Sequence, residues 1–178
     1  MSIDSIKDRI PDYAKDLRLN LGSVLSTQGA PGLSERQVWS IALASAIASR
    51  NVAFAREIEA LARGSIDDST LSGAKAAAAI MGMNNIYYRF VHLVEDKEYH
   101  SMPARLRMNV LANPGIDKND FELLSLAVSA VNGCGMCVTA HDKTLRQHEV
   151  GREAIQSAVR IASVIHAVAG VLEYAEAA

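Results

Sequence analysis

Apolar residues recur at helical spacing along most of this chain, and no segment alternates between apolar and polar residues for long enough to predict a strand. The clearest helix follows Ser34, because Gln37 stands three residues later in the spacing of a capping box. The apolar positions that come next are Val38, Ile41 and Ala42. Further helices are predicted over residues 3–9, 13–21, 52–62, 70–81, 86–94, 103–112, 121–131, 134–148 and 152–176. The pattern therefore predicts an all-α protein.

Glycine, proline and asparagine divide these helices from one another. The segment 23–33 contains Gln28-Gly29-Ala30-Pro31-Gly32 and is expected to be a loop. Gly22 is expected to end the second helix, and Asn132-Gly133 the helix over 121–131. A length of 178 residues fits one domain, so we expect residues 1–178 to form a single helical domain.

One short segment is echoed later in the chain. Residues 80–86 align with residues 131–137, and each copy follows an alanine-containing helix with an aspartate-rich start. The identity between the copies is low, so a duplicated helical hairpin and a chance similarity both account for the echo. If the duplication is real, only the second copy carries thiols.

Composition and charge exclude several classes of partner. Apolar residues make up 49% of the chain and charged residues 21%, and the formal net charge is −2. This charge gives no broad basic surface for nucleic acid or anionic lipid. No run of about 18 uninterrupted apolar residues predicts a membrane span, and the acidic N-terminal segment lacks the apolar core of a secretory signal. We therefore expect a cytoplasmic protein, in a compartment where structural disulfides are rare.

The two cysteines of the chain form a Cys-x-x-Cys motif followed by a histidine. Cys134, Cys137 and His141 stand at positions i, i+3 and i+7, which lie on one face of a helix. Asn132-Gly133 directly precedes them, so Cys134 is expected in the first turn of a new helix. Unpaired backbone N–H groups and the helix dipole favour a thiolate there, and Cys-x-x-Cys thiols at helix starts have lowered pKa values. The spacing and the electrostatics indicate a redox-active pair.

A histidine and a glutamate are candidates for proton transfer beside the thiols. His141 is one helical turn from Cys137 and can carry a proton at neutral pH. Glu122, near the start of the preceding helix, is a candidate to orient the imidazole, as in an orienter–base–nucleophile arrangement. Helix packing decides whether Glu122 reaches the site.

Other interpretations of the same residues stay open. The two thiols can be buried structural cysteines, or they can hold zinc together with His141 and Glu122, although a second pair of ligands is missing. The flanking segments are helical, so the βαβ context of a thioredoxin is absent.

Several stretches of the chain resemble the alkyl hydroperoxidase AhpD family, a branch of the carboxymuconolactone decarboxylase-like superfamily, and the resemblance spans nearly the whole chain. The stretches that carry it are Tyr13-Ala14-Lys15-Asp16, Ala78-Ala79-Ile80-Met81-Gly82-Met83-Asn84-Asn85, Leu106-Arg107-Met108-Asn109, Asn113-Pro114-Gly115-Ile116, Asn119-Asp120-Phe121-Glu122-Leu123, Ser129-Ala130-Val131-Asn132-Gly133-Cys134, and Cys137 with Ala140-His141 and Thr144-Leu145-Arg146.

The resemblance implies an all-α homotrimer without a bound cofactor and an antioxidant thiol–disulfide oxidoreductase with alkyl hydroperoxide reductase activity. Electrons would pass from dihydrolipoamide, on the lipoyl domain of a 2-oxo acid dehydrogenase acyltransferase, through this protein to the peroxiredoxin AhpC. By resemblance, Cys137 forms the sulfenic acid, Cys134 is the proton donor and resolving thiol, and Glu122 and His141 form a proton relay. A decarboxylase-like enzyme on the same scaffold is the alternative within the superfamily.

Two points qualify this expectation. The family's best-known member has histidine between the cysteines, where this chain has Met136, and a methionine cannot transfer protons. Proton handling would then fall to Glu122 and His141, and the peroxidase rate is the property this puts in doubt. In addition, the helix-start argument favours Cys134 as the more acidic thiol, whereas the family assigns attack to Cys137. Access and a nearby base also decide which thiol attacks.

Overall fold

The computed structural model describes residues 2–176, and these residues form helices, turns and loops with no strand among them. The predicted all-α fold is therefore confirmed. In chain order the elements are α1 (Ile3–Lys7), the 3-10 helix η1 (Asp12–Ala14), α2 (Lys15–Val24), α3 (Glu35–Ala48), α4 (Val52–Ala62), α5 (Asp68–Leu93), α6 (Glu98–Ser101), α7 (Asn109–Ala112), α8 (Lys118–Val131), α9 (Gly135–Gln147) and α10 (Arg152–Glu176).

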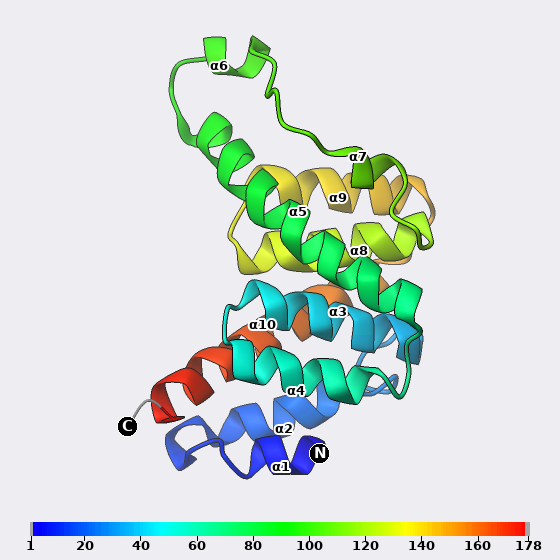
Figure 1. The fold of residues 1–178 in the computed structure, drawn as a ribbon, viewed down its shortest axis with the longest axis vertical. Coiled ribbons are helices and arrows are strands. Elements are labelled where there is room, and N and C mark those ends of the chain that lie inside the picture. The colour runs from blue at the N-terminus through cyan, green and yellow to red at the C-terminus, as the bar shows by residue number, and fades with distance from the viewer. Residues whose placement is uncertain (1, 177–178) are drawn as a thin grey trace.

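The helices stack in layers around α3 and α8 (Figure 1). Helix α3 packs against α4, α5, α8 and α10, while α8 packs against α5, α9 and α10. Helices α8 and α9 form a hairpin that α5 crosses, and α1 and α2 lie at the opposite end of the molecule (Figure 1). The α8–α9 hairpin carries both cysteines, so the fold places them against the middle of α5.

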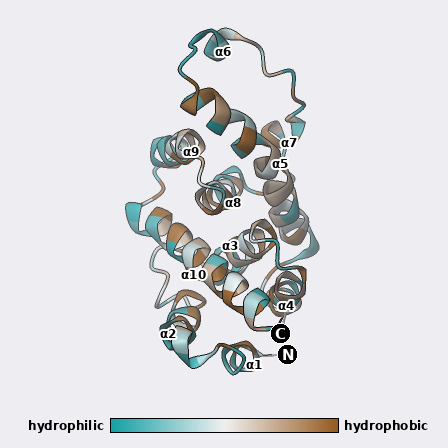
Figure 2. Ribbon diagram, turned by 90° about the vertical axis from the view of Figure 1, so that its left-hand side faces the viewer, coloured by the Kyte–Doolittle hydropathy of each residue, from teal (hydrophilic) through white to brown (hydrophobic). Residues whose placement is uncertain are grey.

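The core consists of aliphatic side chains from the central helices. Most of α3 between Val38 and Ala46 is buried, because the helix lies at the centre of the molecule with other helices around it (Figure 2). Burying one large aliphatic side chain contributes about 1.5–3 kcal/mol, so this cluster holds the layers together. Its largest fully buried members include Leu21, Ile41, Leu43, Phe54, Ile58, Met81, Leu123, Leu124, Leu126 and Leu145.

Polar side chains fix the starts of the principal helices. The predicted capping box of Ser34 and Gln37 is present in both directions. Asn51, Asp67 and Asp117 accept backbone N–H groups at the starts of α4, α5 and α8. Each such cap contributes about 1 kcal/mol, and together they fix the starts of α3, α4, α5 and α8.

Three predicted boundaries are wrong. Gly22 does not end the second helix, which runs on to Val24. Residues 70–81 and 86–94 belong to the single unbroken helix α5, because the polar pair at 84 and 85 is buried inside it. Pro103 does not open a helix. Arg105 adopts a left-handed φ of 51°, and between Pro103 and Asn113 only α7 is helical. The echo therefore aligns residues 80–86, in the middle of α5, with residues 131–137 at the break between α8 and α9.

Helix α10 is the one described helix that is long and apolar enough to cross a membrane by length and composition alone. Core helices of soluble proteins pass the same test, and half of the apolar window of α10 is buried within the molecule. Its buried side chains pack against α2, α3 and α8. Helix α10 thus contributes a large part of the core.

Candidate active site

The break between α8 and α9 sets the position of the thiols. Helix α8 ends at Val131 with Asn132 as its C-cap, and Gly133 takes a left-handed φ of 68°, a conformation that glycine adopts without steric cost. Cys134 follows in an extended conformation as the N-cap of α9. Its Sγ accepts the backbone N–H of Cys137 at 3.3 Å, as a capping oxygen would. The predicted helix start at Cys134 is confirmed, and its sulfur lies where an N–H group and the helix dipole favour negative charge.

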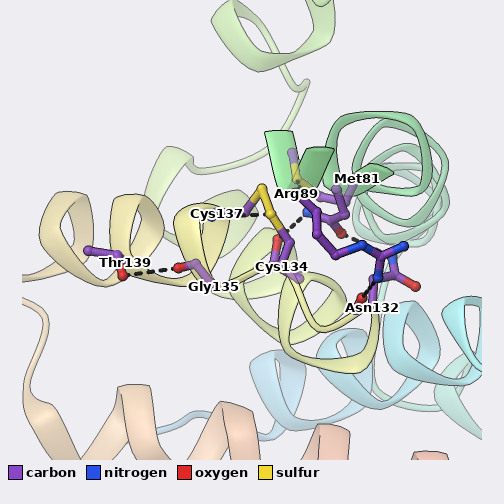
Figure 3. Close-up of a disulfide and its surroundings, with 9 residues drawn as sticks. Met81, Arg89, Asn132, Cys134, Gly135, Cys137 and Thr139 are labelled. Carbon is purple, nitrogen blue, oxygen red and sulfur yellow. Dashed lines mark hydrogen bonds between the residues drawn. A yellow bond between two sulfur atoms is a disulfide. The ribbon is translucent and has the colours of Figure 1, made fainter. Parts of the chain in front are cut away.

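Cys134 and Cys137 are joined by a disulfide (Figure 3). Their Cα atoms are 5.3 Å apart, the separation that one helical turn provides, and it lies within the usual range for disulfides. The pair is unequal in exposure, because Cys134 is 0% exposed and Cys137 is 7% exposed. A molecule that approaches from solvent therefore meets the sulfur of Cys137 first.

His141 and Glu122 form the second pair of the site. His141 Nδ1 lies 2.6 Å from Glu122 Oε2, and the two side chains are 14% and 26% exposed. The antiparallel packing of α8 and α9 brings them together across 19 residues of sequence. The contact occupies Nδ1 of the imidazole and leaves Nε2 as the nitrogen that can exchange a proton with another group. Helix packing thus brings Glu122 to the imidazole, and its role as the orienting residue stays a prediction.

A cavity of about 210 Å³ opens beside Cys137 and His141. One face of α5, the short helix α7 with Met108 before it, and the first half of α9 form its walls. Most of the lining is apolar, and methionine is the commonest lining residue. The lining residues are Met81, Asn84, Tyr88, Met108, Leu111, Met136, Cys137, Ala140 and His141. This arrangement can admit a small molecule with an apolar part and bring a reactive group to Cys137.

A buried polar network stabilises the break between α8 and α9. Asn85 is fully buried, donates from Nδ2 to Ser129 Oγ at 2.8 Å and accepts from Asn132 Nδ2 at 3.0 Å. Arg89 donates to the backbone oxygen of Asn132 at 2.7 Å (Figure 3). The network ties the end of α8 to α5 just before Cys134. No pattern in the sequence assigned Asn85 or Arg89 to the site. Two adjacent asparagines inside an alanine-rich helix are nevertheless a signal, because asparagine is a weak helix former.

The alternative of a metal site gains no geometric support. Among residues 2–176 no three histidine, cysteine, aspartate or glutamate side chains are grouped so that they could hold a metal ion. Glu122 and His141 contact each other, and Cys134 and Cys137 bond to each other. What the arrangement offers is thiol–disulfide chemistry beside a held imidazole.

Comparison with known proteins adds two findings. Residues 97–178 match the carboxymuconolactone decarboxylase family. Proteins named alkyl hydroperoxide reductase AhpD are similar over nearly the whole chain. The one from Brucella canis is 56% identical over 99% of each chain. The one from Rhodospirillum centenum is 58% identical over 100% of this chain and 94% of its own, and that of Bradyrhizobium sp. is 54% identical over 98% and 95%.

Proposed function

The chain belongs to the alkyl hydroperoxide reductase AhpD family, within the carboxymuconolactone decarboxylase-like superfamily, and on that premise we propose that it reduces alkyl hydroperoxides through the dithiol of Cys134 and Cys137. The observation that carries the proposal is the pairing of these cysteines at the start of α9, with Cys137 on a cavity that His141 also lines. Peroxide reduction by a dithiol needs an accessible sulfur, a resolving thiol and a proton carrier, and the site offers one of each.

The oxidative half of the proposed cycle begins at Cys137. Its thiolate attacks the hydroperoxide and becomes a sulfenic acid, and Cys134 then condenses with it to form the disulfide. The burial of Cys134 supports this order, because only Cys137 borders the cavity. In the reductive half, a donor thiol attacks Cys137 and Cys134 is the leaving group. The capping contact at Cys134 Sγ favours the thiolate that leaves in this step.

His141 and Glu122 form the proposed proton relay. His141 would take the proton of the Cys137 thiol and deliver it to the departing alkoxide. Glu122 would hold the ring through Nδ1 and stabilise the imidazolium that forms, as carboxylates do for catalytic histidines. Met136 stands between the cysteines and cannot transfer protons, so the relay of this chain rests on the two residues alone.

Dihydrolipoamide is the proposed electron donor, as a substrate rather than a resident cofactor. The cavity supports this choice, because its apolar wall of methionine and leucine suits the alkyl chain of a lipoyl group. In the cell the donor would be the lipoyl domain of a 2-oxo acid dehydrogenase acyltransferase, and the acceptor the peroxiredoxin AhpC. Both partners imply that the protein works in the cytoplasm.

A homotrimer is the proposed assembly, and an apolar surface at one end of the molecule supports it. The C-terminal end of α5 and α6 project beyond the α8–α9 hairpin (Figure 1), and α6 makes no extensive contact with another described helix. Phe90, Leu93, Tyr99 and Met102 are all exposed there, Leu93 to 71%. We call these four residues the apolar tip. Exposed apolar patches of this kind mark sites of association.

A coupled assay tests the proposed function. The reduced protein is mixed with tert-butyl hydroperoxide, and the loss of thiols is followed with and without later addition of dihydrolipoamide. We expect two thiols per chain to be lost and both to be restored by the donor. Cys134→Ser and Cys137→Ser should each abolish catalytic turnover, and unchanged turnover in either variant would overturn the proposal. Full activity on a lactone after alkylation of both cysteines would instead favour the decarboxylase alternative.

A further inference from the structure

One buried amide in the cavity has an oxygen without a partner. Asn84 is 3% exposed, and its Oδ1 makes no hydrogen bond to any residue of the described chain. A buried carbonyl that gives up water without gaining a donor lowers stability. Unpaired buried oxygens also occur at Ser45, Thr70 and Ser125, but among these Asn84 alone belongs to the cavity beside Cys137. The unpaired oxygen of Asn84 in this cavity therefore calls for a functional explanation.

The neighbouring Asn85 is buried as well, but its amide has hydrogen-bond partners. Asn85 uses both ends of its amide, with Ser129 and Asn132 as partners, and so joins α5 to α8. Asn84 belongs to no such network. Its position on α5 is one turn after Met81 and one turn before Tyr88, and all three line the cavity. The Asn84 side chain therefore borders the same cavity as Cys137.

The oxygen has no surface open to water in this conformation, so a donor inside the cavity reaches it only when the amide turns about its soft terminal torsion. The proposed reaction supplies such a group. When the Cys137 thiolate attacks the proton-bearing oxygen of a hydroperoxide, an S–O bond forms and the O–O bond breaks. The electron pair leaves with the alkoxide, which takes the proton that His141 removed from the thiol and becomes an alcohol. The hydroxyl proton stays on the new sulfenic acid.

We propose that Asn84 Oδ1 accepts the hydrogen bond of this hydroxyl group, first in the bound hydroperoxide and then in the sulfenic acid of Cys137. The inference rests on the proposed function and assigns Asn84 as a substrate-binding residue. The terminal torsion of asparagine is soft, so the amide can follow the oxygen as it transfers to sulfur. The bond ends when the Cys134 thiol attacks Cys137, because the S–S bond then replaces the S–O bond and the oxygen leaves as water.

Asn84→Leu tests this assignment, because leucine has a similar shape and no acceptor. We expect the rate of thiol loss from the reduced variant with tert-butyl hydroperoxide to fall about tenfold, the effect of one lost hydrogen bond in the transition state. Reduction of the variant's disulfide by dithiothreitol should keep its rate within about twofold, since that step involves no hydroxyl group. The thermal midpoint should not fall, because the variant loses a buried oxygen that had no partner.

Matched variants separate this result from a general disturbance. Ser125→Ala removes a buried unpaired oxygen that does not line the cavity, and it should leave both rates unchanged. If leucine disturbs the packing, Asn84→Ala carries the same expectation without adding bulk. An oxidation rate like that of the wild type in the Asn84 variants, or equal losses in oxidation and reduction, would overturn the inference. Failure of the wild-type protein to lose thiols to peroxide would instead overturn the proposed function.

Discussion

Glu122 and His141 come from neighbouring antiparallel helices and meet with Glu122 Oε2 2.6 Å from His141 Nδ1. The contact fixes the ring by Nδ1 and leaves Nε2 for proton exchange. Neither side chain is fully buried, so the pair can adjust as a substrate enters the cavity. The contact therefore orients the imidazole within the site.

His141 should therefore be more costly to replace than its partner. His141→Gln is expected to slow peroxide-dependent thiol loss about 100-fold, the usual range for a lost general acid–base. Glu122→Gln should slow it about tenfold, because the amide keeps a contact but loses the charge that stabilises the imidazolium. Rapid-mixing thiol titration measures both rates. His148→Gln is the control, since His148 ends the same helix and contacts Asn119. A His148 effect as large as that of His141 would contradict the assignment.

Met136→His should raise the peroxidase rate. Met136 is 38% exposed and lines the cavity in the first turn of α9, so a histidine there can reach a bound peroxide. An added proton carrier is expected to raise the rate of thiol loss at least about threefold near neutral pH. Reduction of the disulfide by dithiothreitol should change little. An unchanged peroxide rate across pH 6 to 8 would mean that the relay of Glu122 and His141 already suffices.

Asn85→Ala should destabilise the protein, whereas the same change at position 84 should not. Loss of the Asn85 amide leaves Ser129 and Asn132 without their buried partners, which is expected to lower the free energy of unfolding by about 1–3 kcal/mol. Urea denaturation of both variants measures the difference. Equal destabilisation of the two variants would show that bulk, and not the hydrogen bonds, decides the effect.

The start of α5 should be sensitive to acid. Asp67 accepts the backbone N–H of Thr70 and the hydroxyl of Ser69, and these bonds lower its pKa from 3.8 to about 2. Because the pKa is lower in the folded state, the stabilisation is complete above the unfolded value and is lost as the pH falls through about 2. Asp67→Asn keeps the cap without the charge. The gap in unfolding free energy between wild type and variant should therefore narrow between about pH 5 and pH 2.

Charge placed on the apolar tip should break the proposed trimer. Phe90→Asp combined with Leu93→Asp would bury two carboxylates at any contact formed there, so the oligomer is expected to dissociate to the 19.1 kDa chain. Light scattering after size-exclusion chromatography measures the mass. Leu19→Asp is the matched control, because Leu19 is 77% exposed on α2 at the other end of the molecule. If Leu19→Asp alone dissociated the oligomer, the interface would lie at the α2 end of the molecule instead of at the apolar tip.

The sequence predicted the thiol region more accurately than the scaffold around it. Local signals are strong at the break between α8 and α9, where Asn132-Gly133 forces an end and Cys134 caps a start. The contact between Glu122 and His141 stayed open in the sequence, because only the packing of α8 on α9 brings the two side chains together. The unbroken course of α5 could not be predicted, because tertiary burial of Asn84 and Asn85 overrides their weak helix propensity.

Two further features depended on packing that the sequence does not display. The extended course around Pro103 follows from the left-handed backbone at Arg105. An arginine does not predict that conformation. The cavity is built from residues of three separate segments, and single-helix patterns assign Met81, Tyr88 and Met108 simply to the core or surface. Membership of a cavity is a property of how helices cross, and spacing within one helix does not reveal it.

The burial of Cys134 has a kinetic consequence. If every redox partner must meet the same exposed sulfur, that of Cys137, oxidant and reductant cannot occupy the site together. Each must leave before the other enters, which is a ping-pong order with parallel double-reciprocal plots. Once the disulfide has formed, excess hydroperoxide finds the sulfur of Cys137 already bonded to Cys134 and cannot drive it to the irreversible sulfinic acid. A thiol held out of reach thus protects the one that reacts.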